Sequence, residues 1–264
     1  MLVATWNINS VRLRINIILK FIKNYNIDIL CLQETKTEDK NFPLEKFQSL
    51  GFRYHNIRGE KNYNGVAILS TIKFKKEKNI DWCGFKESRH VSIRFSNNII
   101  LHNFYVPAGG DVPNINTNQK FSHKIKFIKE MIEFFKNSKE VNVLVGDLNI
   151  APYENDVWSH KQLLNVVSHS PAEIIAFQKL LEQGKLVDMI RNNSNLNKKI
   201  YTWWSYRSKN WKISDRGRRL DHVLVSNSIK DNISGQVICK EFRDYEKPSD
   251  HVPIIFDINS ISIK

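Results

Sequence analysis

The chain has 264 residues, 41% of them hydrophobic and 11% aromatic, which excludes a disordered protein and provides enough apolar side chains for a sizeable core. Its 40 basic and 27 acidic residues leave a formal net charge of +13, which favours a polyanionic partner, nucleic acid before an anionic membrane. Cys31, Cys83 and Cys239 form no CxxC pair, no apolar run reaches the roughly 20 residues of a membrane span, and no basic n-region follows Met1. We therefore expect a cytoplasmic protein without a membrane anchor, a zinc ribbon or a disulfide framework.

The first part of the chain predicts strands interrupted by one helix. Residues 2–9 form a predicted strand, and apolar side chains at helical spacing then predict a helix that ends near Tyr25. Residues 27–32 are an apolar run typical of a strand buried on both faces, and this run leads into Gln33 and Glu34. Two antiparallel pairs follow, which join 52–58 with 65–70 and 90–95 with 99–106.

The second part of the chain alternates helices and strands. Apolar side chains at helical spacing predict a helix over about 117–137, and the chain then enters a strand at Val141. A capping box that begins at Ser170 starts a helix that stops at Gly184. Shorter strands are predicted over 220–225, 236–240 and 252–258. Because several strands pair as hairpins, the pattern predicts an α/β protein with two mixed sheets facing each other, in a single domain spanning residues 1–264.

The strand that begins at Val141 ends in two polar side chains, Asp147 and Asn149. Gly146 precedes them and leaves room for a backbone or a ligand to come close. Side chains alternate along an extended backbone, so we expect Asp147 and Asn149 to point the same way while Leu148 enters the core. A carboxylate beside an amide suits the orientation of a water molecule, although ordinary turn chemistry also uses this pair.

Polar side chains lie at the ends of several other predicted strands. Each has an ordinary explanation as a turn or cap residue, but together they form a larger set: Asn7, Glu34, Tyr105, Asp147, Asn149, Asp221, Asp250 and His251. Glu34 and Asn7 offer the oxygen ligands that Mg²⁺ prefers. Asp221 offers a carboxylate that orients the His251 imidazole. The sequence contains no G-x-S-x-G elbow, P-loop or G-x-G-x-x-G, which argues against a serine hydrolase and gives no support for a nucleotide cradle.

A dense aromatic segment, residues 201–207, precedes a basic one made of Lys209, Lys212, Arg216, Arg218 and Arg219. We expect Trp203 and Trp204 to lie partly in the core, because tryptophans bury large areas wherever they occur. The basic residues suit either a solvated loop or contact with nucleic-acid phosphates. The positive net charge favours the phosphates, with an affinity independent of base sequence.

These segments, taken together and in order, resemble the exonuclease III family of apurinic/apyrimidinic (AP) endonucleases. The resemblance extends from residue 3 to residue 256 and is carried by the blocks at 6–9, 32–36, 105–107, 146–152, 201–207, 219–221 and 249–253. It implies a four-layered α/β sandwich, in which two mixed sheets pack face to face and are flanked by helices. It also implies a Mg²⁺ cofactor, for which Mn²⁺ substitutes.

The resemblance implies roles for individual residues. The implied catalytic residues are Tyr105, Asp147, Asn149, Asp221 and His251. The implied metal site draws on Asn7, Glu34, Asp147, Asn149, Asp250 and His251, with Glu34 as the main ligand and Asn9 at its margin. The implied substrate contacts are Trp203, Arg207, Asn149 and Tyr105, with Trp203 against an extruded abasic sugar. Asp147 either activates the attacking water or protonates the leaving group, while His251 stabilises the developing phosphorane charge.

The function that we expect from this resemblance is that of a Mg²⁺-dependent DNA-repair nuclease. It hydrolyses the phosphodiester 5′ to abasic sites in duplex DNA, with 3′→5′ exonuclease and 3′-phosphatase or phosphodiesterase activity in addition. Its partner is duplex DNA with abasic sites or blocked 3′ ends, and it acts as a monomer. Two alternatives remain: a phosphoesterase of the same superfamily that acts on non-DNA substrates, and a catalytically inactive DNA-binding relative.

Overall fold

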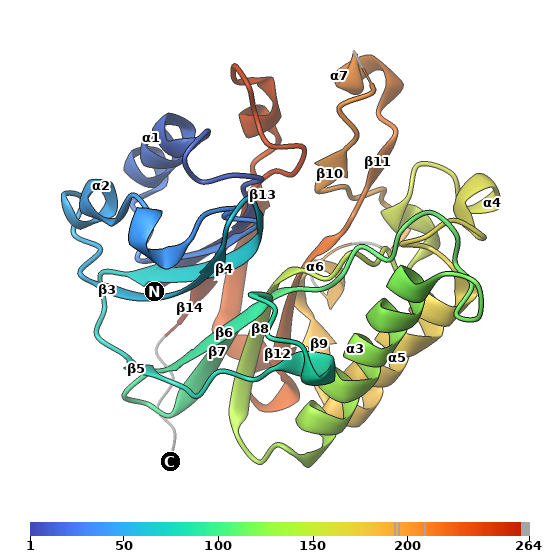
Figure 1. Cartoon of the computed structure of the whole chain (residues 1–264), viewed down its shortest axis with the longest axis horizontal. Helices are drawn as coiled ribbons and strands as arrows, with labels where there is room; N and C mark the ends of the chain where they lie inside the picture. The colour runs from blue at the N-terminus through green and yellow to red at the C-terminus, as the bar shows by residue number, and fades with distance from the viewer. Residues whose placement is uncertain (193, 195, 209, 260–264) are drawn as a thin grey trace.

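Two six-stranded mixed sheets form the centre of the computed structural model, which describes residues 1–192, 194, 196–208 and 210–259 (Figure 1). The first sheet contains, in spatial order, β13 (Ile233–Ile238), β14 (Ile254–Ile258), β1 (Leu2–Asn7), β2 (Ile29–Gln33), β4 (Tyr63–Ser70) and β3 (Tyr54–Glu60). The second contains β5 (Lys75–Lys76), β6 (His90–Arg94), β7 (Ile99–Tyr105), β8 (Val141–Asp147), β12 (Asp221–Ser226) and β9 (Leu186–Asp188). The prediction of two mixed sheets is confirmed.

Helices cover the outer face of each sheet. The first sheet packs against α1 (Ile15–Tyr25) and α2 (Leu44–Gln48), through buried side chains such as Phe21 and Phe47. The second packs against α3 (Gln119–Asn137) and α5 (Pro171–Gly184), through side chains such as Phe127 and Phe177. A third apolar cluster fills the space between the sheets. The four-layered α/β sandwich is therefore confirmed, and Figure 1 shows these helix pairs on opposite sides of the sheets.

The remaining elements are short. They are the ribbon of β10 (Trp203–Trp204) and β11 (Gly217–Arg218), the helices α4 (His160–Leu163), α6 (Met189–Asn192) and α7 (Trp211–Ser214), and the 3₁₀ turns Asp39–Asn41, Trp82–Gly84, Glu154–Asp156, Asn227–Asn232 and Lys240–Asp244. In Figure 1 this ribbon and α7 stand out from one end of the sandwich. Among the described residues, no helix has the length and apolar character needed to cross a membrane.

Most predicted elements are present, with shifted ends that have local causes. Strand β1 ends at Asn7, two residues earlier than predicted, because Asn9 turns the chain with a φ of 47°. Strand β14 begins at Ile254 rather than at residue 252, since Pro253 has no N–H to donate. Strand β13 covers Ile233–Ile238 instead of 236–240, because a bulge at Gly235 breaks the alternation that the prediction relied on.

Strand pairing brings the polar strand ends to one edge of the molecule. Strands β1 and β2 are parallel, as are β7 and β8, so that Tyr105 lies opposite Asp147 in register. Strand β12 runs antiparallel to β8 and pairs Asp221 with Asp147 at the same edge. Gly146 permits this close pairing, because a Cβ at that position would lie 2.0 Å from the Phe104 carbonyl oxygen. The close neighbour that the sequence predicted at Gly146 is thus backbone.

Candidate active site

The predicted site residues converge on one cleft of about 900 Å³ at this end of the sandwich. Eight of the predicted or neighbouring polar and aromatic side chains line it: Glu34, Tyr105, Asp147, Asn149, Trp203, Arg207, Asp250 and His251. Asn7 and Asp221 are fully buried and lie directly behind this lining, in contact with Asp147 and His251 respectively. Segments from both sheets and from the β10–β11 ribbon therefore form a single site.

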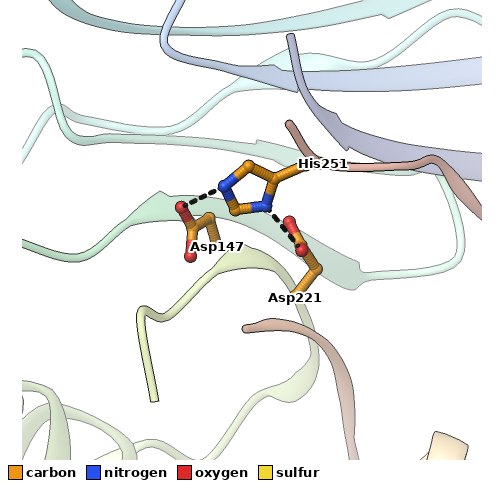
Figure 2. A group of neighbouring side chains, drawn as sticks. All are labelled: Asp147, Asp221 and His251. Carbon is orange, nitrogen blue, oxygen red and sulfur yellow. Dashed lines mark hydrogen bonds and ion pairs between the residues drawn. The ribbon is translucent and has the colours of Figure 1, made fainter. Parts of the chain in front are cut away.

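His251 lies between two carboxylates, as Figure 2 shows. Its Nδ1 donates to Asp221 Oδ2 at 2.8 Å, and its Nε2 lies 3.6 Å from Asp147 Oδ2. Burial alone would lower the pKa of His251, but the charges of Asp221 and Asp147 outweigh burial and raise this pKa to about 10. The imidazole is therefore positively charged at neutral pH, and Asp221 fixes its orientation as the sequence predicted.

Asp147 ends β8 and is fully buried. Burial and the neighbouring charges of Asp221 and Glu34 raise its pKa to about 7, against the lowering effect of His251 and of a hydrogen bond from Asn7. Its carboxyl group thus exchanges a proton near neutral pH, which suits a catalytic acid or base.

Asn149 does lie beside Asp147, but for a different reason from the one predicted. The backbone is not extended there, since Asn149 has a φ of 55°. A turn instead holds the pair: Asn149 N donates to Asp147 Oδ1 at 2.8 Å, and Asn149 Nδ2 lies 3.2 Å from Asp147 Oδ2. The expected strand alternation is therefore wrong at this point, while Leu148 enters the core as predicted.

Asn7 connects the two carboxylates of the site. Its Nδ2 donates to Glu34 Oε1 and to Asp147 Oδ2, both at 2.9 Å. The second oxygen of Glu34 pairs with Lys36 Nζ at 2.7 Å, and Lys36 also donates to Asn9 Oδ1 at 2.6 Å. Lys36 lies two residues after Glu34 in the same sequence block, but the sequence pattern predicts no role for it.

These groups fit a hard divalent cation. The carboxylates of Glu34 and Asp147 supply oxygen donors, and the Asn7 amide lies between them with its Nδ2 towards both. Burial, together with the charges of Asp221 and Glu34, raises the pKa of Asp147, and a bound cation would favour the ionised carboxylate instead. Asp147, Asp221 and His251 also offer ligand atoms within 4.8 Å of one another. The Asp221–His251 hydrogen bond identifies that second group as a device for orienting the imidazole rather than as a chelating set.

Two aromatic side chains complete the lining. Burial, followed by the charges of Glu34 and Asp147, raises the pKa of Tyr105 well above its usual value. The phenol therefore keeps its proton and can act as a hydrogen-bond donor. The Arg89 guanidinium, for which the sequence predicts no role, lies 5.0 Å from the centroid of the Tyr105 ring. Trp203 Nε1 donates to Asp250 Oδ2 at 2.9 Å, and this bond fixes the indole ring in the cleft.

Arg207 and the members of the basic segment that follows it have different surroundings. Arg207, Arg216 and Arg218 line the cleft. Arg219 does not: it is fully buried and pairs with Asp156 and Asp188, at 2.7 and 2.8 Å, so its expected contact with DNA is wrong. The remaining two are Lys212, which is exposed and pairs with Asp244, and Lys209, which lies outside the described residues.

Known proteins are similar to this chain in sequence and structure over nearly its whole length. The model of the Endonuclease/Exonuclease/phosphatase family matches residues 4–251. An exodeoxyribonuclease III from Haemophilus influenzae is 30% identical over 95% of this chain and 97% of its own length. A solved AP endonuclease from Archaeoglobus fulgidus is 30% identical with a TM-score of 0.90, and covers 98% of this chain and 100% of its own. A 3′ phosphatase from Neisseria, bound to a product DNA hairpin, is 28% identical with the same TM-score and the same two coverages. The chain therefore belongs to the endonuclease/exonuclease/phosphatase family, as a nuclease similar to exodeoxyribonuclease III and the AP endonucleases.

Proposed function

We propose that this protein hydrolyses the phosphodiester 5′ to abasic sites in duplex DNA in a Mg²⁺-dependent reaction, and that it trims 3′ ends as an exonuclease and 3′ phosphatase. The observation that carries the proposal is the pairing of Asp147 with a positively charged His251 in a cleft that also exposes Trp203. A phosphodiester is a monoanion, so a fixed cation in its path stabilises the additional charge of the transition state. Arginines at the same cleft supply contacts to the flanking phosphates.

Individual side chains of the site have separate roles in the proposed reaction. His251 donates from Nε2 to a non-bridging oxygen, held in place by Asp221. Asp147 orients the attacking water and takes its proton, while Asn149, whose Nδ2 lies beside the Asp147 carboxylate, holds the same water from the other side. Tyr105 keeps its proton and donates a hydrogen bond from its phenol to the phosphate.

Glu34, Asn7 and Asp147 would hold the metal ion, with Asp250 and Asn149 at its margin. Bound Mg²⁺, or Mn²⁺ in its place, supplies neutralisation of charge on the phosphate oxygens. Trp203 provides an apolar surface for an extruded sugar, and a nucleotide without a base has little stacking to lose on extrusion. One chain contains the whole residue set, so we propose that the protein acts as a monomer.

An end-labelled duplex with one tetrahydrofuran abasic analogue tests this proposal. We expect a single cut 5′ to the analogue with Mg²⁺, no cut in EDTA, and removal of a 3′-phosphate from a second duplex. A matched duplex with an intact nucleotide at the same position serves as the control and should stay uncut there. Hydrolysis of soluble phosphoesters without DNA cleavage would instead identify a phosphoesterase, and binding without any cleavage would identify an inactive relative.

A further inference from the structure

One wall of the cleft carries a second aromatic side chain that the proposed chemistry does not use. Trp158 lines the cleft and is half-buried, with its inner side packed against Leu220 and its neighbours. Arg216, an exposed residue, places its guanidinium 4.7 Å above the Trp158 ring. The outer side of this guanidinium is therefore available to a ligand in the cleft.

Backbone contacts fix Trp158 against the β10–β11 ribbon. Trp158 N donates to Gly217 O at 3.1 Å, and Lys199 Nζ donates to Trp158 O at 2.9 Å. Gly217 is required at this crossing, because a Cβ there would lie 2.6 Å from the Tyr201 side chain. These bonds anchor the Trp158 backbone, and the packing of its ring against the Leu220 cluster holds the indole, which reduces the entropic cost of binding.

The same arrangement occurs again one step nearer the reacting residues. Arg218 lies 5.5 Å over the Trp203 ring, and Trp203 is its partner across the ribbon. Arg216 and Arg218 flank Gly217, so two guanidinium–indole pairs follow one another along the wall from Asp250 outwards. The inner pair, Arg218 and Trp203, faces the proposed sugar site. The outer pair, Arg216 and Trp158, lies beside the inner pair and has no role in the proposed reaction.

The chemistry of the outer pair identifies its ligand. Nucleic-acid bases stack on aromatic rings and on guanidinium planes, and a guanidinium also attracts the phosphate of the same nucleotide. A simple phosphate contact would need only a positive charge and no indole beneath it. We propose that Trp158 and Arg216 form a second nucleotide subsite, which binds an unpaired nucleotide that retains its base, next to the strand end held in the catalytic cleft.

This inference rests on the proposed function, because it requires a DNA strand in the cleft, but binding in EDTA tests it without cleavage. The probes are two labelled hairpins with a one-nucleotide 3′ overhang, 2-aminopurine in one and tetrahydrofuran in the other, which carry equal numbers of phosphates. Base stacking contributes enough for the wild type to bind the 2-aminopurine hairpin about fivefold or more tightly. Its fluorescence should fall on binding as the base stacks.

Three variants separate stacking from charge. Arg216→Lys keeps the positive charge but removes the planar guanidinium on which a base can stack. The ratio of the affinities for the 2-aminopurine and tetrahydrofuran hairpins should therefore fall towards one, while the affinity for the tetrahydrofuran hairpin should not change. Arg216→Ala should lose the preference and also weaken binding of both hairpins. Lys212→Ala, which removes one exposed positive charge outside the cleft, should keep the full preference.

Two results would overturn the subsite. One is a wild type that binds both hairpins equally, and the other is an Arg216→Lys variant with an unchanged preference. If the abasic duplex is still cut in either case, only the subsite is wrong. If neither hairpin binds at all, the proposed function fails as well.

Discussion

Lys124 and Glu173, both without exposed surface, form an ion pair beneath the floor of the active-site cleft. Lys124 Nζ also donates to Asn149 O at 2.7 Å and to Ala108 O at 3.2 Å, while Glu173 accepts from Ser168 N at 2.9 Å. Because Ala108, Asn149 and Ser168 all line the cleft, the pair joins three of its segments.

Removal of one partner leaves an uncompensated buried charge. We expect Lys124→Met to lower the free energy of unfolding by about 3–5 kcal/mol, measured by urea denaturation at pH 7. The double variant Lys124→Met/Glu173→Gln should recover part of that loss, because no charge then remains unpaired. A loss below about 1 kcal/mol in the single variant would show that the pair contributes little net stability.

Acid should destabilise the fold through a pair of buried histidines on the neighbouring strands β6 and β7. His90 Nε2 lies 3.1 Å from His102 Nδ1, and burial lowers the pKa of His102 to about 4 and that of His90 well below its usual value. Below pH 6.5 these two histidines become protonated in the unfolded chain but stay neutral in the folded chain. The free energy of unfolding therefore decreases as the pH falls from about 6.5 to about 4.

The expected loss from His102 alone is about 3 kcal/mol. It is measured by urea denaturation at several pH values for the wild type and for His90→Phe, which preserves the ring stacked on Phe104. The variant should show a shallower decline over this range, whatever its stability at pH 7. An identical pH slope in the two proteins would exclude His90 from the effect.

The salt dependence of DNA binding should distinguish exposed arginines from buried ones. If about five phosphates are neutralised, log affinity falls with log salt with a slope of about −4 to −5. Arg207→Ala or Arg216→Ala should each reduce the magnitude of the slope by about 1, because both residues line the cleft. Arg219→Lys should leave the slope unchanged and lower stability instead, since Arg219 is paired in the core. A reduced slope in Arg219→Lys would contradict this division.

Glu34 should determine the metal requirement. Glu34→Gln removes a carboxylate that faces Asn7 and Asp147, so the Mg²⁺ concentration for half-maximal cleavage should rise about tenfold or more. The measurement is a single-turnover Mg²⁺ titration on the abasic duplex. Glu60→Gln, an acidic side chain bonded to Asn64 outside the cleft, is the matched control and should titrate like the wild type. An unchanged titration for Glu34→Gln would remove this residue from the metal site.

The sequence predicts the catalytic residues well because their positions depend on local features, namely the ends of buried strands. Asn7, Glu34 and Asp147 each end a buried strand or follow it directly, and parallel neighbours end at the same edge of a sheet. The ion pair between Lys124 and Glu173 could also have been predicted from the sequence. Lys124 lies on the apolar face of a predicted helix, and a charge there needs a partner such as the capping-box residue Glu173.

Residues whose roles depend on distant packing were missed or misplaced. Trp158 owes its position to the backbone of Gly217, and Arg89 reaches Tyr105 only through strand pairing. Arg219 lies in a run of basic residues, and its charge pattern does not reveal that Asp156 and Asp188 enclose it. A run of basic residues predicts the sign of the surface charge, but it does not predict which of those residues is buried.

The central claim is that Asp147 and His251 form one catalytic unit that cleaves the DNA backbone. Single-turnover cleavage of the abasic duplex at saturating Mg²⁺ tests it most directly, with Asp147→Asn and His251→Ala compared against Asp231→Asn, an exposed residue beyond the far end of β12. We predict that each of the first two variants slows cleavage by roughly 10²-fold or more, and that Asp231→Asn cleaves at the wild-type rate. Wild-type rates in Asp147→Asn or His251→Ala would contradict the claim.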